Sequence, residues 1–170
     1  MSEPTAPEIE RLSRFFNQLH PESDRGAALI ARAMIEDSLG EILVAFLADT
    51  KAKSKLMKGP TAPFGTLSAR ISVCLALGLI GEDEYHEMEI IRDIGNKFAH
   101  NWDGFSFNDS EVERLCAKLP WRGPEEYRAG ANPKDVFCTA VSMLMVDLMW
   151  RVRLVRKEKR QVKPWPNRSR

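Results

Sequence analysis

The chain of 170 residues has little cysteine: only Cys74, Cys116 and Cys138, widely spaced. No C-x-x-C pair occurs, and an odd number of cysteines cannot close a complete disulfide framework. The sequence therefore indicates neither a zinc knuckle nor a disulfide-rich secreted domain. It predicts three free thiols, most of them packed among apolar side chains, in a reducing cytosol.

Long hydrophobic runs are also missing. A helix that spans a bilayer needs about 18–20 apolar residues, and Glu36, Asp37 and Glu41 interrupt the best candidate. The first ten residues, MSEPTAPEIE, lack the basic and then apolar stretches of a secretion signal. We therefore expect a cytoplasmic protein that has no membrane contact.

An overall excess of charge of either sign is absent, because 25 basic and 24 acidic residues leave a net charge of +1. The charge is unevenly distributed, however. Residues 151–170 carry nine basic residues and one acidic residue, a net +8, whereas residues 1–149 carry 16 basic and 23 acidic residues, a net −7. An acidic body with a basic end limits where nucleic acid could bind.

Strand-length alternation of apolar and polar residues, internal repeats and low-complexity tracts are absent too. Apolar residues instead recur at helical spacing, which predicts an all-α protein, a single bundle of about six or seven helices. We expect one domain over residues 1–160 and a basic tail over 161–170 that Pro164 and Pro166 keep from being helical. The expected helices span about 8–19, 22–49, 67–79, 82–98, 109–118 and 133–159, with a loop or short helix in 51–66 and an irregular stretch over 119–132.

Gly40 lies inside the long second helix of this prediction. A glycine there costs about 1 kcal/mol relative to alanine. A close crossing by another helix would account for it.

The helix predicted over 82–98 follows a tight turn, as the second helix of a helix-turn-helix would. Six acidic residues and Arg92 alone lie between Glu82 and Asp93. A recognition helix lies beside phosphates, which this charge repels. The sequence therefore argues against a conventional DNA-reading helix.

His100 stands four residues after Asn96, so the two share a helix face within hydrogen-bond reach. A histidine there can act as an acid, a base or a pH-sensitive contact; capping of the last carbonyls of the helix is the interpretation we favour. His20 and His86 have no partners at metal-ligand spacing. We predict no metal site and no cofactor.

The basic tail allows two interpretations. Lys and Arg in the last turn of a helix complement its dipole, and a basic segment with a tryptophan can contact phosphates weakly while the indole stacks on a base. Both stay open. The candidates are Arg151, Arg153, Arg156, Lys157, Lys159, Arg160, Lys163 and Trp165.

Three strings together resemble the mannitol operon repressor family of bacterial transcriptional regulators. They are ESDRGAALIARAMIEDSL (22–39), LMKGPTAPFGTLSARISVCLALGLIGEDEYHEMEIIRDI (56–94) and NKFAHNW (96–102). The resemblance implies an all-helical cytoplasmic repressor of mannitol uptake and use that has no recognisable DNA-reading module. It also implies a protein partner or co-regulator, and leaves a homodimer and weak DNA binding open. It does not identify the target operon.

A wider resemblance is to the HEPN helical domains. Their ribonuclease members carry Arg, a polar residue, three further residues and then His. Asn96 and His100 match the last two positions, but Gly95 occupies the Arg position. Arg92 lies about 12 Å from His100 along a helix and is a poor substitute. Without that cation, the transition state of phosphoryl transfer would lack its stabilising charge.

The leading hypothesis is a non-enzymatic regulator that acts through protein contacts or weak nucleic-acid contacts. The rivals are a metal-independent ribonuclease of HEPN type, with His100 as base and Asn96 as orienter, and an adaptor that binds only a protein. The expected surface combines residues 22–25, 59–70 and 92–100, and its candidates are Ser23, Asp24, Arg25, Arg70, Arg92, Asn96 and His100.

Overall fold

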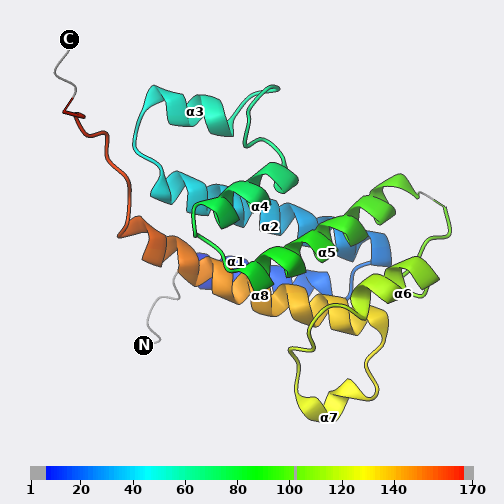
Figure 1. Cartoon of the computed structure of the whole chain (residues 1–170). Coiled ribbons are helices and arrows are strands. Elements are labelled where there is room, and N and C mark those ends of the chain that lie inside the picture. The colour runs from blue at the N-terminus through cyan, green and yellow to red at the C-terminus, as the bar shows by residue number, and fades with distance from the viewer. Residues whose placement is uncertain (1–6, 102, 167–170) are drawn as a thin grey trace.

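The computed structural model describes residues 7–101 and 103–166, and these residues form eight helices and no strand. The all-α class predicted from the sequence is thereby confirmed. The helices are α1 (Pro7–Leu19), α2 (Asp24–Phe46), α3 (Lys51–Met57), α4 (Leu67–Ala76), α5 (Glu82–His100), α6 (Ser110–Cys116), α7 (Glu125–Arg128) and α8 (Pro133–Arg156) (Figure 1).

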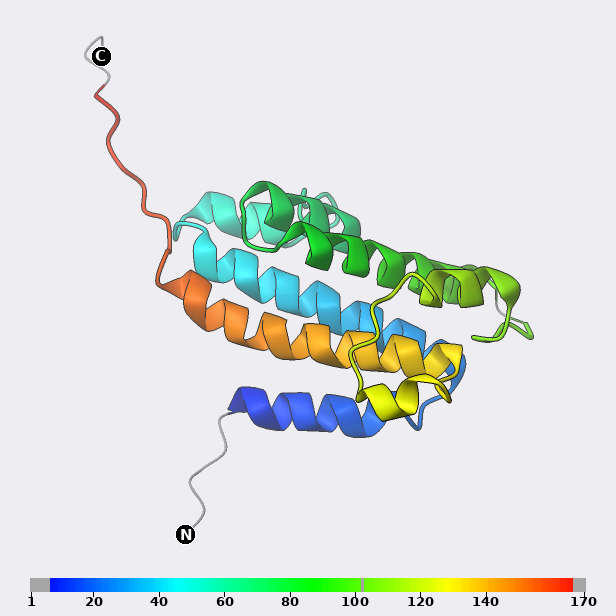
Figure 2. The same ribbon diagram turned by 60° about the horizontal axis from the view of Figure 1, so that its bottom comes forward.

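Helices α1, α2, α5 and α8 form the bundle, with α2 at its centre (Figures 1 and 2). Helices α2 and α8 run parallel: Lys134 pairs with Asp24 at 3.3 Å where both begin, and the Arg160 N–H donates to the Phe46 carbonyl at 2.7 Å just beyond their ends. Helix α4 covers part of α2 and α5, whereas α3 stands away from the bundle at the end of a loop (Figure 1).

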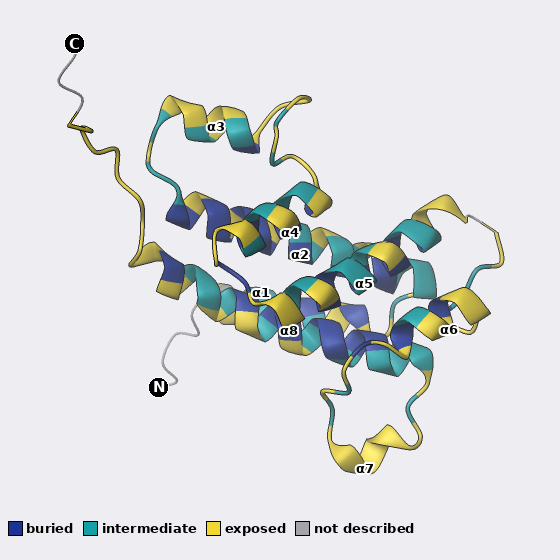
Figure 3. Cartoon of the chain, viewed as in Figure 1, coloured by how far each residue is buried: buried dark blue, intermediate teal, exposed yellow. Residues whose placement is uncertain are grey.

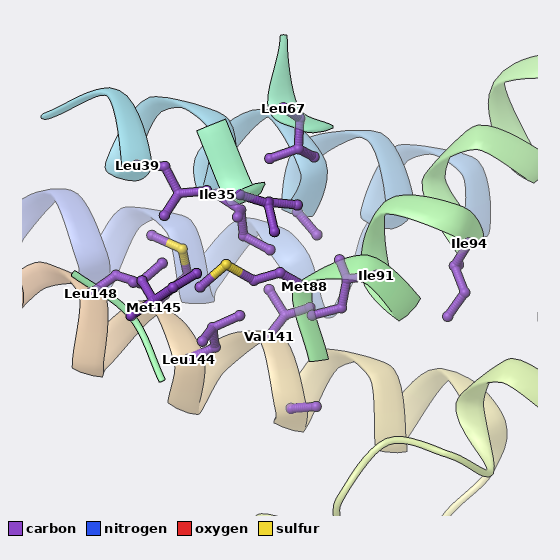
Figure 4. Packing of buried hydrophobic residues seen from close by; sticks show 14 of the residues in the cluster. Ile35, Leu39, Leu67, Met88, Ile91, Ile94, Val141, Leu144, Met145 and Leu148 are labelled. Atoms are coloured by element: carbon purple, nitrogen blue, oxygen red, sulfur yellow. The ribbon is translucent and has the colours of Figure 1, made fainter. Parts of the chain in front are cut away.

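The hydrophobic core lies between α2, α5 and α8. Side chains from these three helices interdigitate, and Ile35, Met88 and Val141 are fully buried at its middle (Figure 4). Helix α2 is buried over much of its circumference and exposes little surface, in contrast to α3 and α7 (Figure 3). This follows from its apolar composition, because a helix that is hydrophobic on most sides must lie inside a fold. All three cysteines are buried and free, as the sequence predicted.

Helices α2, α3, α4 and α8 follow residues whose side chains accept hydrogen bonds from the first free N–H groups. The Thr66 hydroxyl accepts from the Ala69 N–H at 3.3 Å and starts α4. Asn132 and Asp135 form a reciprocal capping box at the start of α8.

Helices α2, α4 and α8 each end three residues earlier than predicted, and α6 ends two residues earlier. Helix α2 stops at Phe46 because Leu47 is extended, and Thr50 then caps α3. Helix α8 stops at Arg156, since the chain turns so that the Arg160 N–H can reach α2. The stretch 119–132 is less irregular than predicted, because it contains the single turn α7.

The extended segment 161–166 runs away from the bundle (Figure 2). The division into a domain (1–160) and a tail (161–170) stays a prediction, and Arg168 and Arg170 lie outside the described residues. Within the described ranges, none of the helices has the length and apolar character needed to cross a membrane.

Candidate functional site

The first predicted cluster, at the start of α2, is occupied by structural contacts. Ser23 caps the helix by accepting from the Gly26 N–H at 3.0 Å. Asp24 accepts from the Phe107 N–H at 3.0 Å in addition to its ion pair with Lys134. Arg25 donates to the carbonyl of Asn101, just after α5. These side chains hold α2, α5 and α8 together at one end of the bundle.

Arg70 does not join this cluster. Its Nε donates to the Phe64 carbonyl at 2.8 Å, and its Nη1 donates to the Glu36 carbonyl at 2.7 Å. Glu36 is eleven residues beyond Arg25 on α2, about 16 Å along the helix axis. Arg70 therefore anchors the loop before α4 to the middle of α2.

The close approach predicted at Gly40 is made by this same side chain. A Cβ built on Gly40 would lie 2.9 Å from Arg70 Nη1. The neighbour is a guanidinium from α4 rather than the backbone of a crossing helix. Glycine leaves the space that Arg70 needs to reach the α2 carbonyl.

The α5 candidates do not form a catalytic pair. Arg92 pairs with Glu89 at 2.7 Å and with Asp93 at 3.0 Å, and the hydrogen bond that its guanidinium donates to Glu89 raises the pKa of the guanidinium. Within the described residues, Asn96 and His100 make no side-chain hydrogen bond, with each other or with any other group.

The expected capping role of His100 is wrong. The Asn101 side chain and backbone N–H both donate to the Lys97 carbonyl, at 2.9 and 3.0 Å, and so cap α5. Asn101 caps α5 in place of His100 because it is the first residue past the helix, where its short side-chain amide can fold back onto the last turn. The His100 side chain is left exposed.

Gly95, at the Arg position of the HEPN pattern, lies where α5 crosses α2. A Cβ there would be 3.2 Å from Arg32 Cδ and 3.5 Å from the Ala28 carbonyl oxygen. The residue is buried, so an arginine would have to displace Arg32 and the helix behind it. The departure from the HEPN pattern at this position thus has a packing reason.

Three of the basic-end candidates are also structural. Arg151 binds Glu84 and the Leu79 carbonyl, each at 2.7 Å. Lys159 pairs with Asp49 at 2.5 Å, and the Arg160 guanidinium lies 5.0 Å from the Phe46 ring centroid. The lysines at 53 and 159 hold the pKa of Asp49 at about 2. The contacts of Lys159 and Arg160 fix the ends of α2 and α8 to each other, whereas Arg151 joins α8 to α5.

The remaining surface at this end combines exposed apolar and basic side chains. Trp150 is 45% exposed, Leu154 is 55% exposed and Trp165 is 85% exposed. We define the C-terminal surface as Trp150, Leu154, Lys157, Val162, Lys163 and Trp165. Trp150 and Leu154 were not among the residues predicted from the sequence. The sequence pattern that could have identified them is a pair of apolar residues four positions apart, on the side of α8 opposite its buried residues.

The Trp150 ring is further ordered by Arg153, whose guanidinium lies 5.0 Å from the ring centroid. Arg156 is another of the basic-end candidates. It lines a hollow of about 720 Å³ between α2, α3 and α8. Of the eight basic-end candidates, Lys157, Lys163 and Trp165 are exposed and take part in none of these contacts, nor do they line this hollow.

Among the described residues, no group of three His, Cys, Asp or Glu side chains is placed to hold a metal ion.

No protein-family model and no curated protein matches the chain. A solved structure that does match is the X-ray structure of the MtlR–HPr complex from Escherichia coli. The match has a TM-score of 0.55 and 21% sequence identity, and it covers 85% of this chain and 98% of the matched chain. The fold of this chain is therefore similar to that of MtlR.

Proposed function

We propose that this protein is a non-enzymatic regulator of the mannitol operon repressor type, and that it acts by binding a protein partner. The observation that carries the proposal is the likeness of fold to MtlR over 98% of the matched chain, which was solved in a complex with HPr. The three sequence strings that resemble the mannitol operon repressor family support the same function.

The C-terminal surface is the docking site that we assign to this partner. Protein interfaces are enriched in tryptophan and depleted of acidic residues at their centre. Trp150 and Leu154 supply the apolar contact, and Lys157 and Lys163 supply positive charge at its edge. A partner with an acidic rim around an apolar patch would complement both features.

Titration calorimetry with purified HPr tests the proposal. We expect saturable binding by the full chain and a loss of at least about tenfold in affinity for Leu154→Asp. Leu29, which is 37% exposed on α2, provides the matched control: Leu29→Asp places the same charge at the other end of the bundle and should bind normally. Absence of binding by the unaltered chain would overturn HPr as the partner.

The nucleic-acid alternative rests on the exposed Trp165 beside Lys163. A gel-shift assay at low salt, with the full chain and with a chain lacking residues 161–170, measures it. A sequence-specific shift that the tail removes would support direct repression instead of action through a protein. A shift that any DNA produces, and that about 200 mM salt abolishes, is ordinary phosphate attraction.

The ribonuclease alternative has a direct test as well. Asn96 and His100 are not linked to each other or to a cation, so we expect no RNA cleavage. Cleavage by the purified chain that disappears in His100→Ala would overturn the non-enzymatic function.

A further inference from the structure

Helix α1 packs against α2 and α8, and a narrow cleft lies where the three helices meet. Its volume is about 120 Å³, and its walls include Leu12, Met34, Met145, Met149 and Val152. An engineered apolar cavity of about 150 Å³ in another protein binds benzene. This cleft is somewhat smaller, so a single six-membered ring is the largest guest that it suits, and methionine side chains adapt to such a guest.

Ser38 is the polar group inside this cleft. It is one of the residues that line it and is only 6% exposed. Within the described part of the chain its hydroxyl has no hydrogen-bond partner, and it is not among the side-chain atoms that are shut off from solvent. Its hydrogen-bonding capacity is therefore open to a molecule in the cleft. A ligand with a polar group at this depth would satisfy Ser38.

Arg156 supplies a positive charge at the mouth. Arg11, Glu41 and Arg153 also line the cleft: Arg11 pairs with Glu41 at 2.5 Å and with Asp37 at 3.5 Å, and the Arg153 guanidinium lies over the Trp150 ring. Arg156 forms no ion pair with any described residue. The mouth of the cleft is thus suited to an anion, for which a guanidinium offers two parallel donors.

We infer that the cleft is a binding site for a small aromatic carboxylate that carries a second polar group at the far end of its ring. The ring lies among the methionines, the carboxylate pairs with Arg156, and the second polar group bonds to Ser38. The inference goes beyond the proposed function, because it assigns the regulator a small-molecule effector.

Titration of the full chain with three matched probes tests the inference. 4-Hydroxybenzoate has both polar groups, benzoate lacks the group that Ser38 would bind, and p-cresol lacks the carboxylate. We expect 4-hydroxybenzoate to bind at least about tenfold more tightly than either of the others. Equal binding of p-cresol, or no binding of any probe, would overturn the inference.

Variants identify the site. Ser38→Ala should lower the affinity for 4-hydroxybenzoate to that for benzoate and leave benzoate unchanged. Arg156→Gln should lower it to the affinity for p-cresol. Lys55→Gln removes an exposed charge on α3, outside the cleft, and should leave the affinity for 4-hydroxybenzoate unchanged. Thermal unfolding confirms that each variant is folded. Undiminished affinity in both cleft variants would place the probe elsewhere and reject the site. HPr binding is measured separately, so the two proposals fail independently.

Discussion

Arg151 of α8 donates two hydrogen bonds to Glu84 of α5, of 2.7 and 3.1 Å, one to each carboxylate oxygen. The same arginine donates to the Leu79 carbonyl at 2.7 Å, and Glu84 Oε2 accepts from the Gly81 N–H at 2.7 Å. The side chains are only 27% and 17% exposed. One ion pair thus closes the turn before α5 and joins it to α8.

Loss of this pair should destabilise the fold. Arg151→Met leaves a partly buried carboxylate without its cation, and we expect the free energy of unfolding to fall by about 1–3 kcal/mol. At this chain length each kcal/mol corresponds to about 2–4 °C in Tm. Lys157→Met, on the open surface of the same helix, should stay within about 0.5 kcal/mol of the unaltered chain. Equal effects of the two changes in urea denaturation would show that the Glu84 pair has no special role.

Gly40 and Arg70 should be energetically coupled. In the unaltered chain, Gly40→Ala gains helix propensity of about 1 kcal/mol, but it pushes Arg70 Nη1 from its place 2.7 Å from the Glu36 carbonyl. In an Arg70→Ala background only the gain remains. We therefore expect Gly40→Ala to stabilise the Arg70→Ala chain by about 1 kcal/mol more than it stabilises the unaltered chain. A double-mutant cycle by urea denaturation measures this difference, and additive effects would contradict the contact.

Glu87 should make stability depend on pH. Its carboxyl is 4% exposed and only Oε2 is paired, with Arg122 at 3.1 Å. Burial raises its pKa above the ordinary 4.5, more than Arg122 lowers it. The folded protein therefore holds this proton more tightly than the unfolded chain does. The stability contributed by Glu87 is complete below the unfolded-state pKa and is lost as pH rises through the folded-state pKa.

The side chain in Glu87→Gln is uncharged at every pH, so this variant does not lose stability through ionisation at position 87. We expect the stability of this variant, relative to the unaltered chain, to improve between about pH 4 and about pH 8 in urea denaturation. Glu126→Gln, at an exposed position in α7, is the control and should show no such trend. A relative stability of Glu87→Gln that falls with rising pH would mean that the ion pair with Arg122 outweighs burial.

The three thiols should be unreactive in the folded protein. Burial raises the pKa of Cys74 and Cys116 to about 12, and that of Cys138 to about 11. Because the thiolate is the nucleophile, Ellman's reagent near neutral pH should modify them only as fast as the chain unfolds. All three should react at once in denaturant. Rapid modification of any one in native buffer would show that its burial is incomplete.

The helical periodicity of the apolar residues was enough to predict the class of fold and most helix positions. Met88, Ile91 and Ile94 recur at spacings that place them on one side of a helix, and all three are buried. Helix ends were harder to predict. The end of α8 depends on the bond between Arg160 and Phe46, residues 114 positions apart, and no local pattern carries that information.

The candidate site shows the same division. The sequence by itself determined an acidic helical body, a basic end, buried cysteines and a helix in which glycine replaces arginine at position 95. Only the tertiary structure decided which polar side chains were already engaged. Arg25, Arg70 and Arg151 look like any exposed cation in the sequence, yet each binds a backbone carbonyl distant along the chain. The structure left Ser38 and Arg156 around a cleft that the sequence did not indicate, because a cleft forms from the packing of three helices and not from the periodicity of any one.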